Sequence, residues 1–276
     1  MTGPPTSFRE FERSGWEDAS VCSHYDEALS AVTRQSVDAL LDAAGVRRGV
    51  RLLDVATGAG YVAGAAAERG AEAVGVDFSS AQVDLARRRY PRVRFEQGDA
   101  EALPFPAESF DAVVSNYGMP HFPEPEAAVR EAYRVLEPGG RFAFTVWDLP
   151  ERAVGFGAIY RAVRSHGSMD VGLPPGPSFQ QFSDPEQCTR VLADAGFRTP
   201  VISHVAQVWR VSAPESVFDD ILKGSVRASA TLRAQSAQAR EAIRAAVGET
   251  IRAFRRGDLY EVPMSAVLAA AVKPAP

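Results

Sequence analysis

The chain has 276 residues, a formal net charge of −5 and charged residues at 24% of its positions. This length suits one large domain or one domain with an insertion, and a hydrophobic content of 46% is ordinary for a globular protein. The acidic balance argues against a nucleic-acid partner, because proteins that bind phosphate backbones usually carry a surplus of basic residues.

Cysteine usage and targeting signals bear on where the protein works. The two cysteines, Cys22 and Cys188, form neither a metal-spaced pair nor a disulfide framework, and the histidines show no metal-ligand spacing. Residues 1–14 contain proline and charges where a signal peptide would have an apolar core. No apolar run approaches the roughly 18–20 residues that a membrane helix needs. We therefore expect a cytoplasmic protein with no metal site and no membrane span.

Helices and strands alternate along the first half of the chain. Apolar positions on one face predict a helix over residues 24–44, which Gly45 would end. The predicted strands that follow are residues 50–55, 73–77, 93–96, 110–115 and 142–147, and the predicted helices between them are residues 60–68, 79–89 and 124–136. Short, continuously apolar strands that alternate with helices indicate a parallel sheet covered on both faces.

The pattern changes after Trp147. Residues 150–182 are rich in glycine and proline, and Ser183 is expected to cap a helix that runs to about residue 195. Later predicted elements are a strand over residues 201–211, helices over about 214–232 and 236–256, and a final strand over 263–272. We predict three parts: an N-terminal helical lid at 1–48, a cofactor-binding core at 49–148, and at 149–276 the rest of the sheet with helical substrate-binding insertions.

The most informative segment is RLLDVATGAG, residues 51–60. Gly58 and Gly60 let the backbone pass close to a ligand, and the start of the following helix offers unpaired N–H groups. Asp54 lies just before this turn, where a carboxylate suits a cationic or amine-bearing ligand better than a pyrophosphate. The segment GAGYVA also fits the G-x-G-x-x-A form of a nicotinamide-binding fingerprint, so both cofactor classes stay open at this point.

Further candidate ligands follow the second and third predicted strands. Asp77 ends the second strand, where it could accept both ribose hydroxyls of a nucleoside, and Phe78 could pack on the adenine face. Asp99 follows the third strand and could accept a hydrogen bond from the adenine amine, while the N–H of Ala100 could donate to a ring nitrogen. Because ligands of open α/β sheets lie beyond the carboxyl ends of the strands, we expect these residues to converge on one molecule.

The fourth predicted strand ends in SNYGMPHF, residues 115–122, where the reactive end of a ligand would lie. We assign Asn116 to the cofactor and name His121 as the candidate general base, because histidine titrates near neutral pH. Tyr117 could line a sulfonium or acceptor pocket, since an aromatic face attracts a cation. For His121 and Tyr117 the alternative is packing in the turn or the core. Tyr25 could close over the cofactor as part of a lid or anchor the first helix.

Four segments together resemble a known family: DVATGAG, VGVDFS, QGDAEALPFPAESFDAVVSNYG and REAYRVLEPGGRFAFTVW. In order and spacing they resemble the class I S-adenosylmethionine (SAM)-dependent methyltransferases, nearest to the ubiquinone/menaquinone-type enzymes, over about residues 50–147. The resemblance implies a Rossmann-like, mostly parallel seven-stranded α/β sheet with an antiparallel final strand and helices on both faces.

The resemblance also implies roles for the strand-end residues. It places Asp54, Gly58 and Gly60 beside the methionine part of SAM, Asp77 beside the ribose, and Asp99 with Ala100 beside the adenine. The same loop contains Ala56 where many relatives have glycine, a change that we expect the loop to accept.

We therefore predict a SAM-dependent methyltransferase that acts on a small molecule by in-line methyl transfer. The acidic charge and several apolar side chains predict a largely apolar or aromatic acceptor; these side chains are Phe156, Tyr160, Phe179, Phe182 and Trp209. One alternative is a SAM-binding protein with a non-methylating role. Another is an NAD(P)-dependent oxidoreductase, which would usually need a Tyr-x-x-x-Lys pair; here Asp219 and Ala269 stand four positions before the two lysines.

Overall fold

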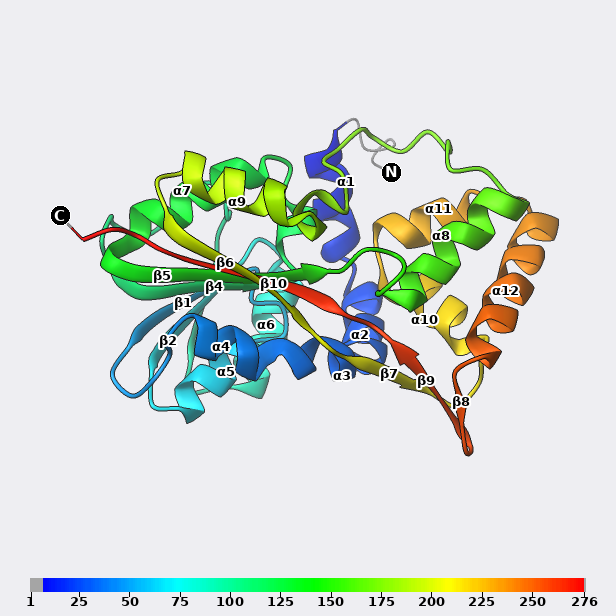
Figure 1. Ribbon diagram of the computed structural model, residues 1–276, viewed down its shortest axis with the longest axis horizontal. Coiled ribbons are helices and arrows are strands. Elements are labelled where there is room, and N and C mark those ends of the chain that lie inside the picture. Colours follow the sequence, from blue (N-terminus) through cyan, green and yellow to red (C-terminus); the bar gives the residue numbers. More distant parts are fainter. Residues whose placement is uncertain (1–6, 276) are drawn as a thin grey trace. The chain divides into compact units, whose positions relative to one another are not determined.

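The computed structural model describes residues 7–275, and these form two compact units that alternate along the chain. The sheet unit contains residues 33–147, 176–205 and 266–275, and the helical unit contains residues 7–32, 148–175 and 206–265. Figure 1 labels the elements of both units.

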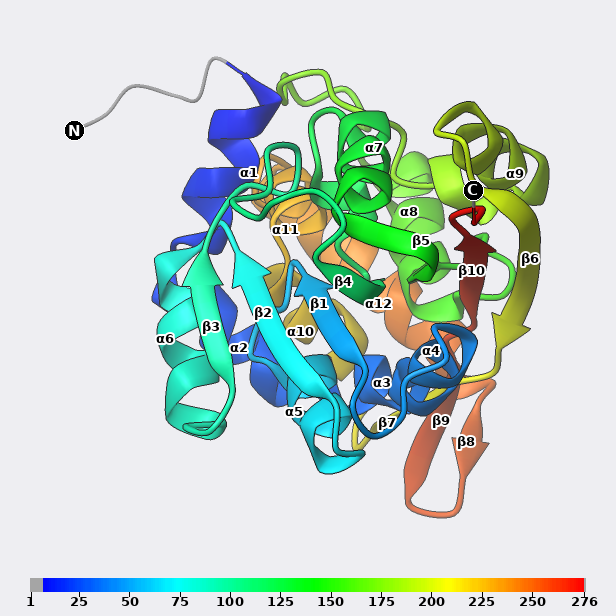
Figure 2. The same ribbon diagram turned by 90° about the vertical axis from the view of Figure 1, so that its left-hand side faces the viewer.

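The sheet unit is built on seven strands in the order β3-β2-β1-β4-β5-β10-β6 (Figure 2). The first five strands of the chain pair in parallel, and β10 runs antiparallel to both of its neighbours. Their bounds are β1 Arg51–Val55, β2 Glu72–Asp77, β3 Arg94–Gln97, β4 Phe110–Asn116, β5 Leu136–Trp147, β6 Arg198–Val205 and β10 Ala266–Val272. The predicted Rossmann-like fold with an antiparallel last strand is confirmed.

Helices cover both faces of this sheet, as the uninterrupted apolar strands predict. They are η1 Arg34–Ser36, α4 Val37–Ala43, α5 Tyr61–Glu68, α6 Ser80–Arg89, η2 Met119–His121, α7 Pro125–Val135, η3 Gln181–Ser183 and α9 Pro185–Asp194. Leu53 and Val113 belong to a buried cluster with α7 and α9, whereas their neighbours Leu52 and Val114 belong to a cluster with α4 and α5. Successive residues of β1 and β4 thus point to opposite faces, and both faces are buried.

The helical unit combines seven helices among the described residues with a small antiparallel sheet, β7-β9-β8. Its helices are α1 Phe8–Trp16, α2 Ala19–Ala28, α3 Ser30–Thr33, α8 Val154–His166, α10 Ser216–Gly224, α11 Arg227–Arg233 and α12 Ala237–Arg252, of which α3 leads into the sheet unit. Its strands are β7 Val208–Val211, β8 Arg255–Arg256 and β9 Leu259–Pro263. Within the unit, α2 packs on α10 and α8 packs on α12. No helix within residues 7–275 is both long and apolar enough to span a bilayer.

Several sequence-based boundaries were wrong. The helix predicted over residues 214–232 is divided into α10 and α11, and the strand predicted over 142–147 begins at Leu136. The helix predicted over residues 24–44 is divided among α2, α3, η1 and α4, and the strand predicted over 201–211 ends at Val205 and resumes as β7 in the other sheet. The helix after Ser183 is capped instead by Asp184, whose Oδ1 accepts a hydrogen bond from the Glu186 N–H at 2.9 Å. With Pro185 at the first helical position, this cap fixes where α9 begins.

Helix α8 lies within the glycine- and proline-rich residues 150–182, where no helix was predicted before Ser183. Two of its glycines sit against neighbouring chain: a Cβ on Gly157 would lie 2.1 Å from the carbonyl oxygen of Pro150, and one on Gly155 would lie 2.8 Å from Met264 Sδ. These glycines allow close packing of the helix rather than ending it, and that requirement is invisible in the local sequence.

Candidate functional site

The glycine-rich turn after β1 has two glycines with different physical tasks. Gly60 precedes α5 with a φ of +83°, and a Cβ there would lie 2.8 Å from Phe95 Cζ, so both backbone conformation and packing require glycine. Gly58 has a φ of +53°, and a Cβ there would meet nothing within 4 Å. The backbone at Gly58 therefore borders open space, as close approach of a ligand requires.

Two non-glycine residues at this edge of the sheet have left-handed backbone conformations. Ala56 follows β1 with a φ of +57°, and Tyr117 follows the neighbouring strand β4 with a φ of +61°. Each such conformation costs about 1–2 kcal/mol for a residue that has a Cβ. The expectation that Ala56 is a minor change therefore omitted this strain. Strained backbone gathers at functional sites, where the surrounding structure holds it in place.

Asp54 is the most deeply buried acid of the turn, with no exposed surface. Its Oδ2 accepts hydrogen bonds from Thr57 Oγ1 at 2.6 Å and from the Ala63 N–H at 3.1 Å. Its Oδ1 is also buried and accepts no hydrogen bond from the described residues. Burial raises the pKa of Asp54 to about 7, against the effect of these two donors, and the charge of Asp77 adds to the rise.

Asp77 ties the end of β2 to the glycine-rich turn. Its Oδ2 accepts from the Gly58 N–H and its Oδ1 from the Ser79 N–H, both at 2.9 Å. Burial raises the pKa of Asp77, while the two N–H donors and the charge of His121 act in the opposite direction. The structure thus brings Asp54, Asp77 and His121 together, although they belong to three different segments of the sequence.

The residues predicted to border adenine follow β3 at the same edge. The Gly98 N–H donates to the Asp77 carbonyl at 2.9 Å, and Asp99 is the next residue. One carboxylate oxygen of Asp99 accepts from the Glu101 N–H at 2.9 Å, and Ala100 is buried. Phe78 is half-buried, and its carbonyl accepts from Gln97 Nε2 at 2.9 Å.

The loop after β4 is held by polar contacts between distant residues. Asn116 Oδ1 accepts from Ser36 Oγ at 2.9 Å and from Thr145 Oγ1, and its Nδ2 donates to the Thr33 carbonyl at 3.1 Å. The Asn116 amide therefore fixes the loop, and its assignment to the cofactor stays a prediction. Its partners in α3, η1 and β5 were not anticipated.

The two residues proposed for catalysis have different surroundings. The Tyr117 ring is buried and lies 4.3 Å, centroid to centroid, from Trp147 at an interplanar angle of 34°. His121 ends η2 and is half-buried, so part of its side chain remains accessible. The Tyr117 ring is therefore part of the core, and a direct role of Tyr117 or His121 in the reaction stays a prediction.

Tyr25 belongs to the helical unit and not to the sheet unit that contains the other predicted residues. Its ring packs edge-on against Trp16, with centroids 5.3 Å apart and planes at 87°. This pair joins α1 to α2 within the helical unit. A lid function for these helices stays a prediction.

Sequence reasoning missed two cations beside the glycine-rich turn. Tyr61, the first residue of α5, has the Arg34 guanidinium carbon 4.7 Å and the Arg89 guanidinium carbon 4.5 Å from its ring centroid. The adjacency of Tyr61 to Gly60 could have drawn attention to this ring, but nothing in the sequence pairs it with Arg34. Together with the helix N-terminus, these guanidinium groups favour an anionic group near the turn. Within residues 7–275 no group of three or more potential metal ligands was found.

Comparisons with known proteins support the methyltransferase prediction. A family model described as a methyltransferase domain matches residues 53–144. The demethylmenaquinone methyltransferase of Thermus thermophilus is 38% identical in an alignment of 182 residues that covers 59% of this chain and 80% of that protein.

Solved structures show the same fold. Phosphoethanolamine N-methyltransferase 2 of Haemonchus contortus, solved with S-adenosyl-L-methionine, matches with a TM-score of 0.59 at 21% identity. The match covers 99% of this chain and 61% of that one. The [4+2]-cyclase SpnF matches with a TM-score of 0.52 at 24% identity, over 88% of this chain and 81% of the cyclase chain. Because a cyclase shares the fold, the fold alone does not define the reaction.

Proposed function

Because the chain belongs to the class I SAM-dependent methyltransferases of the quinone-methyltransferase type, we propose that the carboxyl ends of β1 to β4 hold SAM for methyl transfer to a small, largely apolar or aromatic acceptor. The observation that carries this proposal is the meeting of Asp54, Asp77 and the Gly58 N–H at one turn. The acidic residue before the turn also speaks against the nicotinamide alternative.

The residues of this edge fit each part of SAM. The unused acceptor capacity of Asp54 Oδ1 suits an ammonium group, and Arg34 with Arg89 would favour the nearby carboxylate. Each Asp77 oxygen accepts one backbone N–H and retains lone pairs for a ribose hydroxyl. Asp99 and Ala100 would border the adenine. When bound, SAM supplies an electrophilic methyl group on a sulfonium.

The main task of the protein is then to hold the acceptor in line with that methyl group. A near-attack pose can contribute about 7–11 kcal/mol, whereas a positioned base contributes about 3–5 kcal/mol. The hydrogen bonds that fix Asn116 and the strained backbone of Tyr117 give the loop after β4 one defined shape. A rigid loop supports positioning, which is the larger of the two effects.

Support for an apolar acceptor comes from relatives and from two accessible aromatic residues. The matched relatives are named for demethylmenaquinone, a quinone. Of the five aromatic residues expected to line a pocket, Phe156, Phe182 and Trp209 are buried in the cores of their own units, and only Tyr160 and Phe179 are partly accessible. Incubation with SAM and phenolic or quinol compounds should yield S-adenosylhomocysteine and an acceptor heavier by one methyl group. Acceptor turnover without S-adenosylhomocysteine would instead indicate a cyclase-like role.

Replacing His121 with alanine tests its proposed role as general base. Its removal should lower kcat by about 10²-fold or more while SAM affinity stays the same, because a base acts on the acceptor proton and not on cofactor binding. Single-turnover kinetics and SAM titration measure both effects. His166→Ala, on a helix of the other unit, is the control. An unchanged kcat for His121→Ala would assign the residue to packing alone.

The raised pKa of Asp54 predicts that stability depends on pH. Between about pH 4 and pH 7 the folded chain keeps a proton on Asp54 that an unfolded aspartate, with a pKa of about 3.9, has lost. The free energy of unfolding contributed by this group should therefore fall as pH rises through that window and level off above it. Denaturant unfolding from pH 5 to pH 8 should show a smaller decline in Asp54→Asn than in the wild type. Identical slopes in the two proteins would contradict this assignment.

A further inference from the structure

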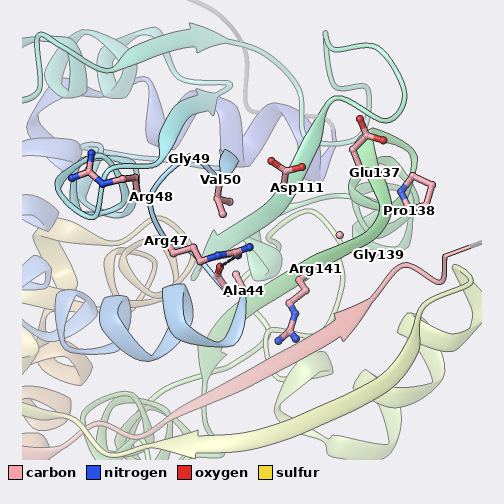
Figure 3. Close-up of a pocket in the computed structure, with 12 residues that line it drawn as sticks. Ala44, Arg47, Arg48, Gly49, Val50, Asp111, Glu137, Pro138, Gly139 and Arg141 are labelled. Carbon is pink, nitrogen blue, oxygen red and sulfur yellow. Dashed lines mark hydrogen bonds between the residues drawn. The ribbon is translucent and has the colours of Figure 1, made fainter.

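A hollow of about 520 Å³ lies at the amino ends of β1 and β4, the opposite end of these strands from the glycine-rich turn (Figure 3). It is lined by the loop from the end of α4 to β1, by the first residues of β5, and by Asp111 of β4. All of these residues belong to the sheet unit. The volume is within the roughly 300–1,000 Å³ that is usual for small-molecule sites.

The two carboxylates of the hollow share one cation, Arg51. Arg51 Nη2 lies 2.7 Å from Asp111 Oδ1 and 3.2 Å from Glu137 Oε1. The Arg51 guanidinium holds the pKa of Asp111 below its usual range, and the charge of Arg47 acts in the same direction. Arg51 therefore offsets one of the two negative charges of Asp111 and Glu137.

Three further arginines line the hollow without a carboxylate partner among residues 7–275: Arg47, Arg48 and Arg141. Figure 3 shows the Arg47 side chain reaching toward the middle of the hollow, and the Arg141 and Arg48 side chains pointing away from Asp111 and Glu137. Even without Arg48, the three guanidinium groups of Arg47, Arg141 and Arg51 outnumber the two carboxylates, in a chain whose net charge is −5. The hollow is thus a locally positive site on an acidic protein.

Structural hydrogen bonds occupy only part of the donor capacity of Arg47 and Arg141. Arg47 Nη1 donates to the Gly45 carbonyl at 3.4 Å and Arg141 Nη1 to the Ala43 carbonyl at 3.5 Å, contacts that suit cations at the end of α4. Both distances are long for an N–H···O bond. Each contact uses one of the five N–H donors of its guanidinium group, and the others remain available.

We propose that this hollow binds a small phosphate-bearing molecule with at least two negative charges, at a site separate from that of SAM. A guanidinium group matches two phosphate oxygens at once, and Arg47 and Arg141 supply two such groups beside the same space. The surplus of guanidinium groups over carboxylates favours a dianion over a neutral ligand. The proposal does not depend on which acceptor the enzyme methylates.

Calorimetric titration of the full chain with inorganic pyrophosphate at low salt tests this site. Arg47→Gln combined with Arg141→Gln should weaken binding at least tenfold, since each lost charge-assisted hydrogen bond is worth about tenfold or more. Arg130→Gln, an exposed arginine of α7 outside the hollow, should bind pyrophosphate as the wild type does. Added salt should weaken the interaction.

Two further variants separate binding from folding and from the cofactor site. Arg47→Lys with Arg141→Lys keeps the positive charges beside α4, so thermal stability should match the wild type while pyrophosphate binding weakens through loss of the two-point contact. Asp77→Asn should leave pyrophosphate affinity unchanged even where SAM binding fails. No pyrophosphate binding by the wild type, or equal binding by the Arg47 and Arg141 variants, would overturn the proposal.

Discussion

Asp77→Asn is expected to lower the affinity for SAM by about a hundredfold or more. The carboxylate accepts the N–H groups of Gly58 and Ser79, one on each oxygen. An asparagine has only one acceptor oxygen, so its NH₂ group would face one of these donors, and a ribose hydroxyl would lose its charged partner. Hydrogen bonds to charged groups contribute about 1.5–3 kcal/mol each, and losing two corresponds to roughly 10²-fold or more in affinity. Isothermal titration with SAM measures the loss.

Asp84→Asn is the matched control for that experiment. Asp84 lies in α6 of the same unit, its side chain is 61% exposed, and it pairs with Arg87 at 3.5 Å. Exposed pairs of this kind contribute little, so this variant should bind SAM as the wild type does. An affinity of Asp77→Asn within threefold of the wild type, in a protein shown to be folded by its unfolding transition, would remove Asp77 from the cofactor site.

Gly60→Ala is expected to lower the free energy of unfolding by about 2–5 kcal/mol. The left-handed backbone costs about 1–2 kcal/mol, and overpacking against Phe95 and Ala86 adds about 1–3 kcal/mol, since the new Cβ would lie 2.8 Å from Phe95 Cζ and 3.0 Å from Ala86 Cβ. Gly139→Ala separates the two effects, because Gly139 has the same φ of +83° with nothing within 4 Å of its Cβ position. It should lose only about 1–2 kcal/mol. Denaturant unfolding of both variants gives the comparison.

Gly58→Ala should lower SAM affinity more than stability, whereas Gly60→Ala should mainly lower stability. Its φ of +53° carries backbone strain, but a Cβ would meet no protein atom within 4 Å. The methyl group would project into the space assigned to the ligand, so SAM affinity should fall more steeply than stability. Equal SAM affinity for Gly58→Ala and the wild type would show that the ligand passes elsewhere.

The elements around the cofactor site could be predicted because their signals are local. The run of apolar residues in β1 indicates a strand buried on both faces, and the following Gly58 and Gly60 indicate a turn with unusual backbone angles. Asp54 and Asp77 lie in the last two positions of their predicted strands and Asp99 follows the third, so the rule that ligands lie beyond the carboxyl ends of strands was enough to group them. In the structure Asp54 and Asp77 lie within the last two residues of β1 and β2, and Asp99 lies two residues after β3.

The remaining features depend on contacts between distant segments. The sequence near Asn116 does not indicate that Ser36 and Thr145 will donate hydrogen bonds to its amide oxygen. Likewise, the sequence near Arg34 does not indicate that its guanidinium group will lie over the Tyr61 ring. Similarly, the local sequence does not show that the glycines of α8 are required by the close packing of Pro150 and Met264 against the helix. Local sequence describes propensity, whereas these contacts follow from the way the chain packs.

A crystal structure of the protein with S-adenosylhomocysteine tests the central claim most directly. We expect the ribose hydroxyls within hydrogen-bonding distance of Asp77, at about 2.5–3.2 Å, the adenine beside Asp99 and Ala100, and the amino-acid end at Gly58. The nucleoside bound away from the ends of β1, β2 and β3, with Asp77 contacting only Gly58 and Ser79, would contradict the account.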